Sequence, residues 1–381
     1  MIYLDNCATT KPREEVVEAV VSALKDDFAN PSSLHRFGHE IEKKIDVARE
    51  NLARLVNVSP SEIYFTSSGT ESNNIALHGF INKNKRLGNK IITTKIEHAS
   101  VLEQLRSYVD KGFEVVEIGV DENANLDLDN LYREIDDNTI VVGLFHVNNE
   151  IGTVNPIEEI VKKIKSINKN VLVHIDGVQA IGKIDVDLRK IGCDSYSMSG
   201  HKIYGPKGIG ALYLKSNVKI NSLVIGGGQE SGLRSGTENV PGILGFGIAA
   251  KIIKENFSKE HNHAVEIKKY LINSLNTIGD IKINTPENSS PYIVSVSIKD
   301  TRAEVLLHYL EQDEIYVSTA SACTSNGTHK SHVLEAMGIK REYAEGTIRI
   351  CSSKDITIED IDLFIDRLKF YVNEIRSIMK R

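Results

Sequence analysis

Short apolar runs alternate with stretches of helical spacing through the first two thirds of the chain. Ser72–Leu87, Val101–Lys111 and Ile157–Ile167 carry apolar residues at intervals of three and four, which predicts helices packed on one face. The runs that predict strands are EIYFTSS (62–68), KIITTK (90–95), FEVVEIG (113–119), TIVVGLFHV (139–147), VLVHID (171–176), DSYSMSG (194–200) and GALYLK (210–215). Apolar strands separated by helices predict a mostly parallel sheet that is covered on both faces.

The pattern becomes looser after a long helical stretch from about Pro241 to Leu275. The elements expected beyond it are a strand at 292–298, a helix at 302–311, strands at 314–318 and 347–350, and a terminal helix from about Thr357. We therefore predict an α/β protein with two domains. The large domain, 14–257, would hold a mostly parallel seven-stranded sheet, and 1–13 with 258–381 would form a smaller α+β domain.

The composition is that of an ordinary globular protein, with 41% hydrophobic and 26% charged residues among 381. A net charge of −6 without a long basic run argues against direct contact with nucleic acid. No stretch approaches the roughly 18 apolar residues of a membrane span, and the N-terminus lacks the pattern of a secretory signal. The four cysteines are far apart, which is typical of a reducing compartment. We expect a cytoplasmic enzyme without a metal site or a membrane anchor.

Four polar features stand at junctions between predicted strands and helices or in a glycine-rich turn. Asp176 ends VLVHID, Lys202 stands in SGHKIYGPKG, FTSSGT (65–70) leads into a helix, and His98 stands in EHAS. Ligands of open α/β sheets bind where parallel strands end, and a helix start offers N–H donors to a phosphate. Taken singly, each feature also has a plain interpretation. Asp176 would be a helix cap or a loop carboxylate, and Ser68 or Thr70 would cap the helix that follows. His98 would be a cap or a packed side chain, and Lys202 would be a solvated charge.

Taken together, the four features fit pyridoxal 5′-phosphate (PLP), which needs a lysine, a carboxylate facing the pyridine nitrogen, and donors for its phosphate. The sequence resembles the cysteine desulfurases, in the class V branch of the fold-type I PLP-dependent transferases. The resemblance covers almost the whole chain. The motifs that carry it, in family order, are YLDNCATT, NPSSLHRFG, FTSSGTESNN, EHAS, HVNNEIGT, HIDGVQA, SGHKIYGPKG, RSGTEN, SACTS, SHVLEAMG and IRI.

This resemblance implies a role for each matching residue. Lys202 would carry PLP as a Schiff base, Asp176 would pair with the pyridine nitrogen, and His98 would stack on the ring and assist proton transfers. The remaining cofactor contacts implied are Gln179 to the phenolic oxygen, Gly69, Thr70, Ser199 and His201 to the phosphate, Asn149 beside the cofactor and the substrate carboxylate, and Thr237 from the second subunit of a homodimer.

Two further residues concern the reaction. Cys323 lies among small polar residues in STASACTSNGTHKSH, a setting that favours a nucleophile over a buried thiol. The resemblance implies that Cys323 takes sulfur from L-cysteine, which leaves L-alanine and an enzyme-bound persulfide. The sulfur would pass to an acceptor protein, either an iron–sulfur scaffold or a tRNA thiolation enzyme. Arg349 would bind the substrate α-carboxylate, although a structural salt bridge is the plain alternative.

The sequence departs from the family at a few positions and leaves alternatives open. Cys7 stands where alanine is usual; we interpret it as a small packed residue, with a second thiol near the site as the alternative. ICSSKD (350–355) lacks the glycine common there. We also expect no apolar C-terminal extension of the kind with which some relatives dock a scaffold protein, which leaves the sulfur acceptor open. A selenocysteine lyase or aminotransferase of the same fold remains an alternative, as does a non-catalytic partner protein. Dinucleotide binding is not supported, because no G-x-G-x-x-G opens a helix after the first strand.

Overall fold

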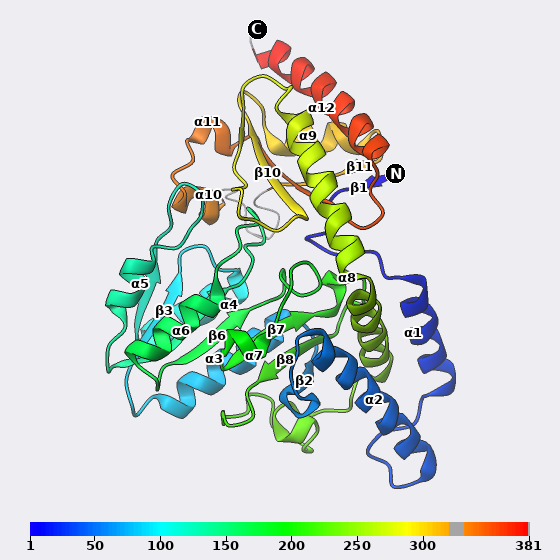
Figure 1. Cartoon of the computed structure of the whole chain (residues 1–381), viewed down its shortest axis with the longest axis vertical. Coiled ribbons are helices and arrows are strands. Elements are labelled where there is room, and N and C mark those ends of the chain that lie inside the picture. Colours follow the sequence, from blue (N-terminus) through cyan, green and yellow to red (C-terminus); the bar gives the residue numbers. More distant parts are fainter. Residues whose placement is uncertain (320–330, 380–381) are drawn as a thin grey trace.

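The computed structural model describes residues 1–319 and 331–379, and it has a broad lower part and a narrower upper part (Figure 1). The lower part is built on a seven-stranded sheet with the order β2-β8-β7-β6-β5-β3-β4. All seven strands predicted from the sequence are present. They are β2 (Ile63–Thr66), β3 (Lys90–Thr94), β4 (Glu114–Ile118), β5 (Thr139–Phe145), β6 (Leu172–Asp176), β7 (Ser195–Ser199) and β8 (Gly210–Leu214).

Strand direction brings most strand ends to one edge of this sheet. Strand β8 is antiparallel to both of its neighbours, β2 and β7, and the other pairings are parallel. Strand β2 therefore runs in the same direction as β7, β6, β5, β3 and β4. The carboxyl ends of these strands meet at one edge, where ligands of such sheets bind. The prediction of a mostly parallel seven-stranded sheet is confirmed.

The two faces of the sheet are covered by different helices. Ile91 and Val141 belong to a hydrophobic cluster with residues of α3 (Gly69–Asn84) and α4 (Ala99–Arg106). The next residues along the strands, Ile92 and Val142, belong to another cluster. The helices that contribute to that cluster are α1 (Glu14–Asp26), α2 (Arg36–Leu55), α5 (Leu128–Glu134), α6 (Ile157–Ile167), α7 (Leu188–Ile191), α8 (Val240–Leu275) as far as Ala264, and α10 (His332–Ala336) of the upper part. Because side chains alternate along a strand, one apolar run serves both faces.

Helix α8 connects the lower part to the upper part (Figure 1). Its 36 residues correspond to a length of about 54 Å at 1.5 Å per residue. The upper part contains a four-stranded antiparallel sheet, β12-β13-β10-β9, and the parallel pair β1-β11. Its elements are β1 (Ile2–Tyr3), β9 (Ile281–Ile283), β10 (Ile293–Ile298), α9 (Ala303–Glu311), β11 (Ile315–Tyr316), β12 (Ser318–Thr319), α10 (His332–Ala336), α11 (Arg341–Ala344), β13 (Thr347–Cys351) and α12 (Ile358–Met379).

The upper part has a hydrophobic cluster of its own. Ile2 and Leu4 join it from the N-terminus, and its other buried members come from Ile267 to Ile375. All of these residues fall in the predicted small domain, 1–13 with 258–381. The cluster supports this division, whose boundaries stay a prediction.

Two elements differ from the sequence-based expectation. The strand expected at 314–318 is divided, because β11 pairs with β1 while β12 pairs with β13. The helix expected to reach Lys111 ends at Arg106 and is followed by a 3₁₀ turn, Val109–Lys111, that Gly112 closes at φ 83°. In the part of the chain that is described, no helix is both long and apolar enough to cross a membrane.

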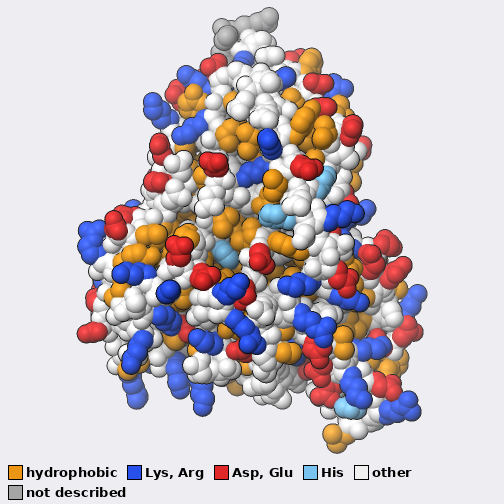
Figure 2. Space-filling view, viewed as in Figure 1, with side chains coloured by type: hydrophobic (Ala, Val, Ile, Leu, Met, Phe, Trp, Pro, Cys, Tyr) orange, Lys and Arg blue, Asp and Glu red, His pale blue; other side chains and the backbone are white. Residues whose placement is uncertain are grey.

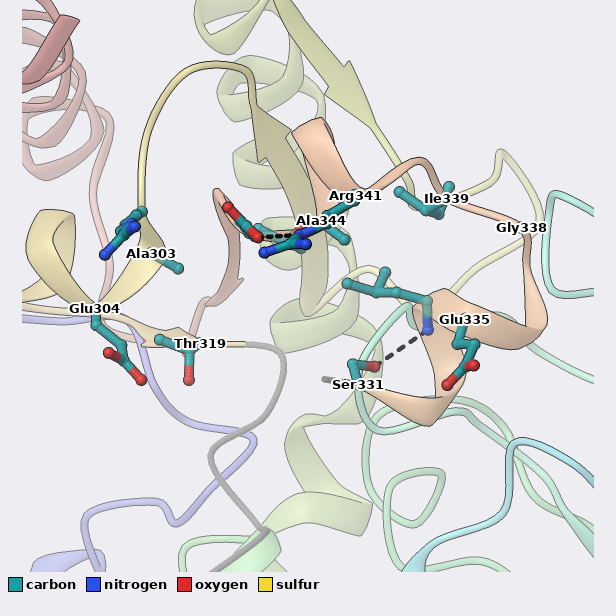
Figure 3. A pocket seen from close by; sticks show the side chains of 13 residues that line it. Ala303, Glu304, Thr319, Ser331, Glu335, Gly338, Ile339, Arg341 and Ala344 are labelled. Atoms are coloured by element: carbon teal, nitrogen blue, oxygen red, sulfur yellow. Dashed lines mark hydrogen bonds and ion pairs between the residues drawn. The ribbon is translucent and has the colours of Figure 1, made fainter. Parts of the chain in front are cut away.

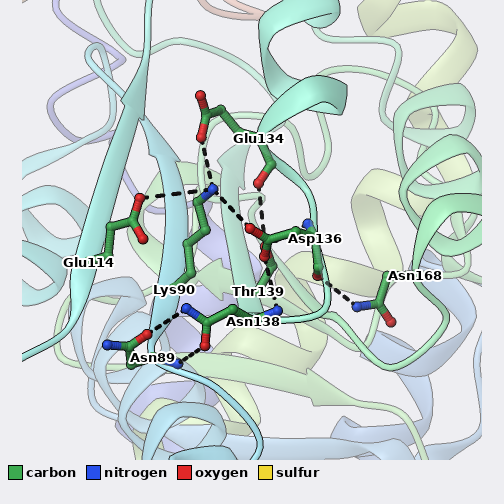
Figure 4. A network of polar contacts seen from close by, with 8 residues as sticks. All are labelled: Asn89, Lys90, Glu114, Glu134, Asp136, Asn138, Thr139 and Asn168. Atoms are coloured by element: carbon green, nitrogen blue, oxygen red, sulfur yellow. Dashed lines mark hydrogen bonds and ion pairs between the residues drawn. The ribbon is translucent and has the colours of Figure 1, made fainter.

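The edge of the sheet at which the parallel strands begin is stabilised by ion pairs. The half-exposed carboxylates around Lys90, at the start of β3, come from separate segments (Figure 4). The Lys90 Nζ atom lies 2.9 Å from Glu134, 3.3 Å from Asp136 and 3.9 Å from Glu114. Because the buried ammonium is satisfied by these neighbours, we interpret this edge as structural. Figure 2 shows charges of both signs over one face of the molecule, and histidine side chains at the waist between its two parts.

Candidate active site

The residues singled out in the sequence gather at the edge where the parallel strands end. Asp176 is the last residue of β6 and Ser199 the last of β7. The segments that follow the other strands supply Gly69 and Thr70 after β2, His98 after β3, and Asn149 after β5. The sheet topology therefore brings together residues that are far apart in sequence.

The carboxylate of Asp176 is held by hydrogen bonds from three elements. Its Oδ2 accepts from Asn73 Nδ2 at 2.9 Å, and its Oδ1 accepts from Val178 N at 3.0 Å and from Ser197 Oγ at 3.4 Å. The side chain is therefore more than a helix cap. A carboxylate fixed in this way at a strand end can face a protonated ring nitrogen.

Asn73 is oriented by a chain of buried groups, and the sequence analysis missed it. Because a carboxylate only accepts, the amide Nδ2 must face Asp176 and Oδ1 must accept. Oδ1 lies 2.9 Å from His174 Nε2, and His174 Nδ1 lies 2.8 Å from Ser195 Oγ. We assign the proton of His174 to Nε2 on this basis. Burial lowers the pKa of His174 to about 4, so the ring is neutral.

His98 caps α4, as the plain interpretation expected, and it also lies within electrostatic range of Asp176 and Lys202. Its Nδ1 accepts from Ser100 N at 3.1 Å and lies 2.8 Å from Ser100 Oγ. Ser100 Oγ itself accepts from Asn73 at 2.8 Å, so its own hydrogen points to His98 Nδ1. The neutral ring therefore carries its proton on Nε2. Burial and the Lys202 charge lower the pKa of His98, although Asp176 opposes them.

Lys202 ends a 3₁₀ turn, Gly200–Lys202, directly after β7. Its Nζ donates to the carbonyl oxygens of Cys7 and Ala8, the latter at 2.8 Å. The amine is thus held at the sheet edge by the N-terminal segment and is not a solvated surface charge. Burial and the charges of Lys202 and Lys183 lower the pKa of the neighbouring His201 to about 4.

The residues expected at the phosphate include two buried polar atoms without a partner. Among the described residues, neither Ser199 Oγ nor His201 Nδ1 has a hydrogen-bond partner. Buried polar atoms are rarely left unpaired, so a bound group would complete them. Gly69 begins α3 beside them, and a Cβ there would meet Val178 Cγ2 at 2.4 Å and Ser199 Cβ at 3.6 Å. Ser68 caps this helix through Glu71 N, which also confirms the plain interpretation. The donors present fit a phosphate.

Gln179 is held by a buried lysine that the sequence analysis also missed. Its Nε2 donates to the Cys7 carbonyl at 3.0 Å, and its Oε1 accepts from Lys183 Nζ at 2.6 Å. Lys183 is 5% exposed, so its charge acts at short range in a dry environment. One amide hydrogen of Gln179 remains for the predicted contact with the phenolic oxygen.

Arg349 reaches the site from β13 of the upper part. It donates to the Asn149 carbonyl at 2.9 Å and forms an ion pair with Asp5 at 3.0 Å. The structural salt bridge considered as an alternative is therefore present. Arg349 Nε is buried and has no partner among the described residues, which leaves donor capacity for a carboxylate. The charges of Cys351, Cys7 and Asp5 keep the pKa of Arg349 above its ordinary value despite burial.

The remaining predicted residues have different outcomes. Cys323 lies outside the described residues. Thr237 is exposed, in the segment before α8. Cys7 is 1% exposed, which confirms a packed residue, yet its carbonyl contacts Lys202, so the second interpretation also holds. Cys193 and Cys351 are buried, as expected.

A cavity of about 570 Å³ opens in the upper part, between α9, α10 and α11 (Figure 3). Thr319 and Ser331, the described residues on either side of 320–330, both line it. None of the residues predicted to bind PLP lines it. The residues predicted to bind PLP therefore lie apart from this cavity, at the sheet edge.

Comparisons with known proteins agree with this geometry. Residues 2–364 match the model of the aminotransferase class-V family. With the fold and the sheet-edge site, this match defines a fold-type I PLP-dependent enzyme. The chain is 40% identical to cysteine desulfurase IscS of Clostridium botulinum over 99% of its length and 96% of that relative. It is 38% identical to cysteine desulfurase IscS 1 of Archaeoglobus fulgidus, over 99% of this chain and 98% of that one.

A solved structure described as a NifS-like protein superposes with a TM-score of 0.93 at 40% identity, covering 98% of this chain and 99% of that one. The chain belongs to the cysteine desulfurases, PLP-dependent enzymes that act on L-cysteine and transfer its sulfur to acceptor proteins. The resemblance and the fold class deduced from the sequence are confirmed.

We predict that Asn73→Ala weakens both the fold and cofactor retention. The change removes a donor to Asp176 and leaves the His174 N–H unpaired, at a cost of about 1–3 kcal/mol in the free energy of unfolding. Chemical denaturation and the PLP content after dialysis measure the two effects. Asn84→Ala is the control, because that side chain bonds only the Phe80 carbonyl in the same helix. Equal losses in the two variants would contradict the role of Asn73.

We predict that Glu97→Gln changes how stability depends on pH. Burial and the Asp176 charge raise the pKa of Glu97 well above its ordinary value. In the unfolded chain, Glu97 has the ordinary glutamate pKa of about 4.3. At a pH above this value, the unfolded state therefore binds fewer protons than the folded state. The free energy of unfolding then falls with rising pH, by at most about 1.4 kcal/mol per pH unit, until the folded pKa is passed. Glutamine keeps the acceptor for Thr94 and Phe145 N and removes this loss.

Melting temperatures of cofactor-saturated protein between pH 5 and 8 test this prediction. The advantage of Glu97→Gln over the parent should grow with pH. Glu122→Gln, at an exposed carboxylate, should follow the parent curve. A constant offset between Glu97→Gln and the parent would rule out a protonated Glu97.

Proposed function

We propose that the protein removes the sulfur of L-cysteine, forms L-alanine and a persulfide on Cys323, and passes the sulfur to an acceptor protein. The main support is a pair of buried atoms, Ser199 Oγ and His201 Nδ1, that have no hydrogen-bond partner within 1–319 and 331–379. They lie at the sheet edge where Lys202, Asp176 and His98 converge. A phosphate would satisfy both atoms, and the amine and carboxylate would then face the remainder of the cofactor.

Each side chain around the cofactor has a separate role in the proposed reaction. PLP, when bound, withdraws electrons from the substrate Cα. Lys202 would hold PLP, and its amine, when free, would take up the Cα proton of the substrate. Asp176 would pair with the ring nitrogen, and Gln179 would donate to the phenolic oxygen. His98 would lie against the ring and could donate the proton on Nε2, because Ser100 already occupies Nδ1.

The substrate contacts come from both parts of the molecule. Arg349 binds the α-carboxylate with the N–H groups that Asp5 and Asn149 leave available, and Asn149 lies beside it. Gly69, Thr70, Ser199 and His201 bind the phosphate. The Cys323 thiolate attacks the substrate sulfur, so that an S–S bond forms as the C–S bond breaks. The carbon gains the electron pair and a proton, which gives alanine, and the enzyme keeps the sulfur as a persulfide.

We further propose a homodimer in which Thr237 reaches the phosphate site of the second subunit. Its support is that Thr237 is exposed, as is Ile225 at 87%, in the segment that precedes α8. An interface would cover both residues. A cytoplasmic location is supported by the free thiols of Cys7, Cys193 and Cys351, which a reducing compartment preserves. We propose an iron–sulfur scaffold or a tRNA thiolation enzyme as the acceptor.

We predict that Cys323→Ala lowers alanine production from L-cysteine by at least about 10³-fold while the PLP absorption is kept, because the nucleophile is lost but the cofactor site is intact. Ser321→Ala, a change in the same segment, should retain most of the activity. Alanine release is measured with L-cysteine and L-selenocysteine, with and without a keto acid, which separates the desulfurase from the lyase and aminotransferase alternatives. Unchanged turnover in Cys323→Ala would eliminate the assigned nucleophile.

We predict that Lys202→Ala abolishes the visible absorption of lysine-bound PLP, since its amine is the one assigned to the Schiff base. Lys207→Ala, which changes an exposed lysine five residues further along the chain, should keep the parent spectrum. Borohydride treatment of the parent followed by peptide mapping should place the label on Lys202. A label on another lysine would refute this proposal.

A further inference from the structure

Two cysteines that have no place in the proposed reaction meet beneath Lys202. Cys351 ends β13, and the N-terminal segment runs alongside it. Cys351 N donates to Leu4 O at 2.7 Å, and Asn6 donates to the Cys351 carbonyl through N at 3.3 Å and Nδ2 at 3.0 Å. The side chains of Cys7 and Cys351 are hydrogen-bonded to each other. Both are reduced, and they are 1% and 0% exposed.

The backbone on both sides fixes this contact. The Cys7 carbonyl accepts from Gln179 and Lys202, and Asp5 pairs with Cys351 in a parallel bridge. The backbone of both cysteines is therefore held in place by bonds to the site. The two thiols are 344 residues apart in sequence. The segments that hold them together are the N-terminal segment, β13, the segment after β6 that carries Gln179, and the turn after β7 that carries Lys202.

The charges around the pair are mainly positive. Lys183 approaches from the segment after β6, Lys202 from the turn after β7, and Arg349 from β13 itself. Asp5 and Tyr3 lie on the N-terminal segment, where Asp5 is paired with Arg349. Three cations around two buried thiols favour a negative charge on one sulfur.

We propose that Cys7 and Cys351 form an oxidisable dithiol, which a small peroxide such as hydrogen peroxide converts to an intramolecular disulfide. The site is separate from the sulfur-accepting role given to Cys323 and does not depend on it.

The protonation of the pair supports this assignment. Burial by itself would raise the pKa of Cys7, but the hydrogen bond from Cys351 and the charges of Lys183, Arg349 and Lys202 lower it below its ordinary value. Burial and the Cys7 thiolate raise the pKa of Cys351 well above the ordinary value. Cys7 therefore serves as the nucleophile, and Cys351 supplies the proton and then the second sulfur.

The oxidation is balanced without a further reactant. The Cys7 thiolate attacks one peroxide oxygen, the O–O bond breaks, and Cys7 becomes a sulfenic acid while hydroxide takes the Cys351 proton to form water. The Cys351 thiolate then attacks the Cys7 sulfur, the S–O bond breaks, and the second oxygen leaves as hydroxide, which takes from the solvent the proton that Cys7 had released and becomes water. Two thiols lose two electrons, and the peroxide gains them. The small size of hydrogen peroxide suits a pair that is almost fully buried.

The test uses full-length holoenzyme that carries Cys323→Ala, so that the described cysteines are the only thiols. After stoichiometric hydrogen peroxide, the free thiols of the denatured chain are counted and its peptides are mapped without reduction. We expect two of the three thiols to be lost, a peptide that joins Cys7 to Cys351, and full recovery of thiols with dithiothreitol. This readout does not depend on activity, so it is independent of the proposed desulfurase reaction.

Single variants separate the two roles. Cys351→Ser should form no disulfide, and its Cys7 should instead be trapped as a sulfenic acid when the oxidised chain is unfolded in the presence of dimedone. Cys193→Ser is the matched control, because Cys193 is also buried but lies apart from the pair, and it should keep the Cys7–Cys351 link. Recovery of Cys7 and Cys351 as unmodified thiols, or a disulfide to Cys193 or to a second chain, would overturn the proposal.

Discussion

The buried carboxylate of Asp176 needs hydrogen-bond donors, and much of the site is arranged to provide them. Asn73 comes from α3, Ser197 from β7 and Val178 from the turn after β6. These three elements must therefore be correctly placed relative to one another. Asn73 is itself fixed by His174 and Ser100, and Ser100 fixes His98. A polar network of this kind is stable only when every member is satisfied. The tautomer of His98 thus follows from the same constraint as the orientation of Asp176.

The upper part is attached to this network through two short segments. The N-terminal segment carries Asp5 and the carbonyl oxygens that Lys202 contacts, and the loop after β5 carries Asn149 and Glu150. Glu150 accepts from Ser331 Oγ at 2.6 Å, and Asn149 accepts from Arg349. Burial raises the pKa of Glu150. Arg349 and Lys202, to which we assign substrate and cofactor binding, therefore share neighbours, and these contacts link the two parts of the molecule.

The positive charges of the site also favour the proposed dithiol. A site that binds a carboxylate and a phosphate gathers cations, and Lys183, Lys202 and Arg349 lie within range of Cys7. Such a field stabilises any acid placed in it. Serine or alanine would be inert there, but cysteine at both positions 7 and 351 makes a redox-active pair. Packing alone explains why these residues are small; it does not explain why both are thiols.

Local patterns in the sequence predicted the strands of the large sheet, several of the helices and the polar residues at strand ends, but not α1, α2, α5 or α7. Alternation and helical spacing are properties of residues that are close in sequence. Because ligands of parallel sheets bind where the strands end, Asp176, Ser199 and His98 are then expected at one edge. Sequence could not reveal Asn73, Lys183 or Asp5 as parts of the site, since each acts through a partner on another element. It also could not show that Cys7 meets Cys351, or that 314–318 divides between two sheets. Those features depend on how distant segments pack, and no periodicity within a single segment encodes such contacts.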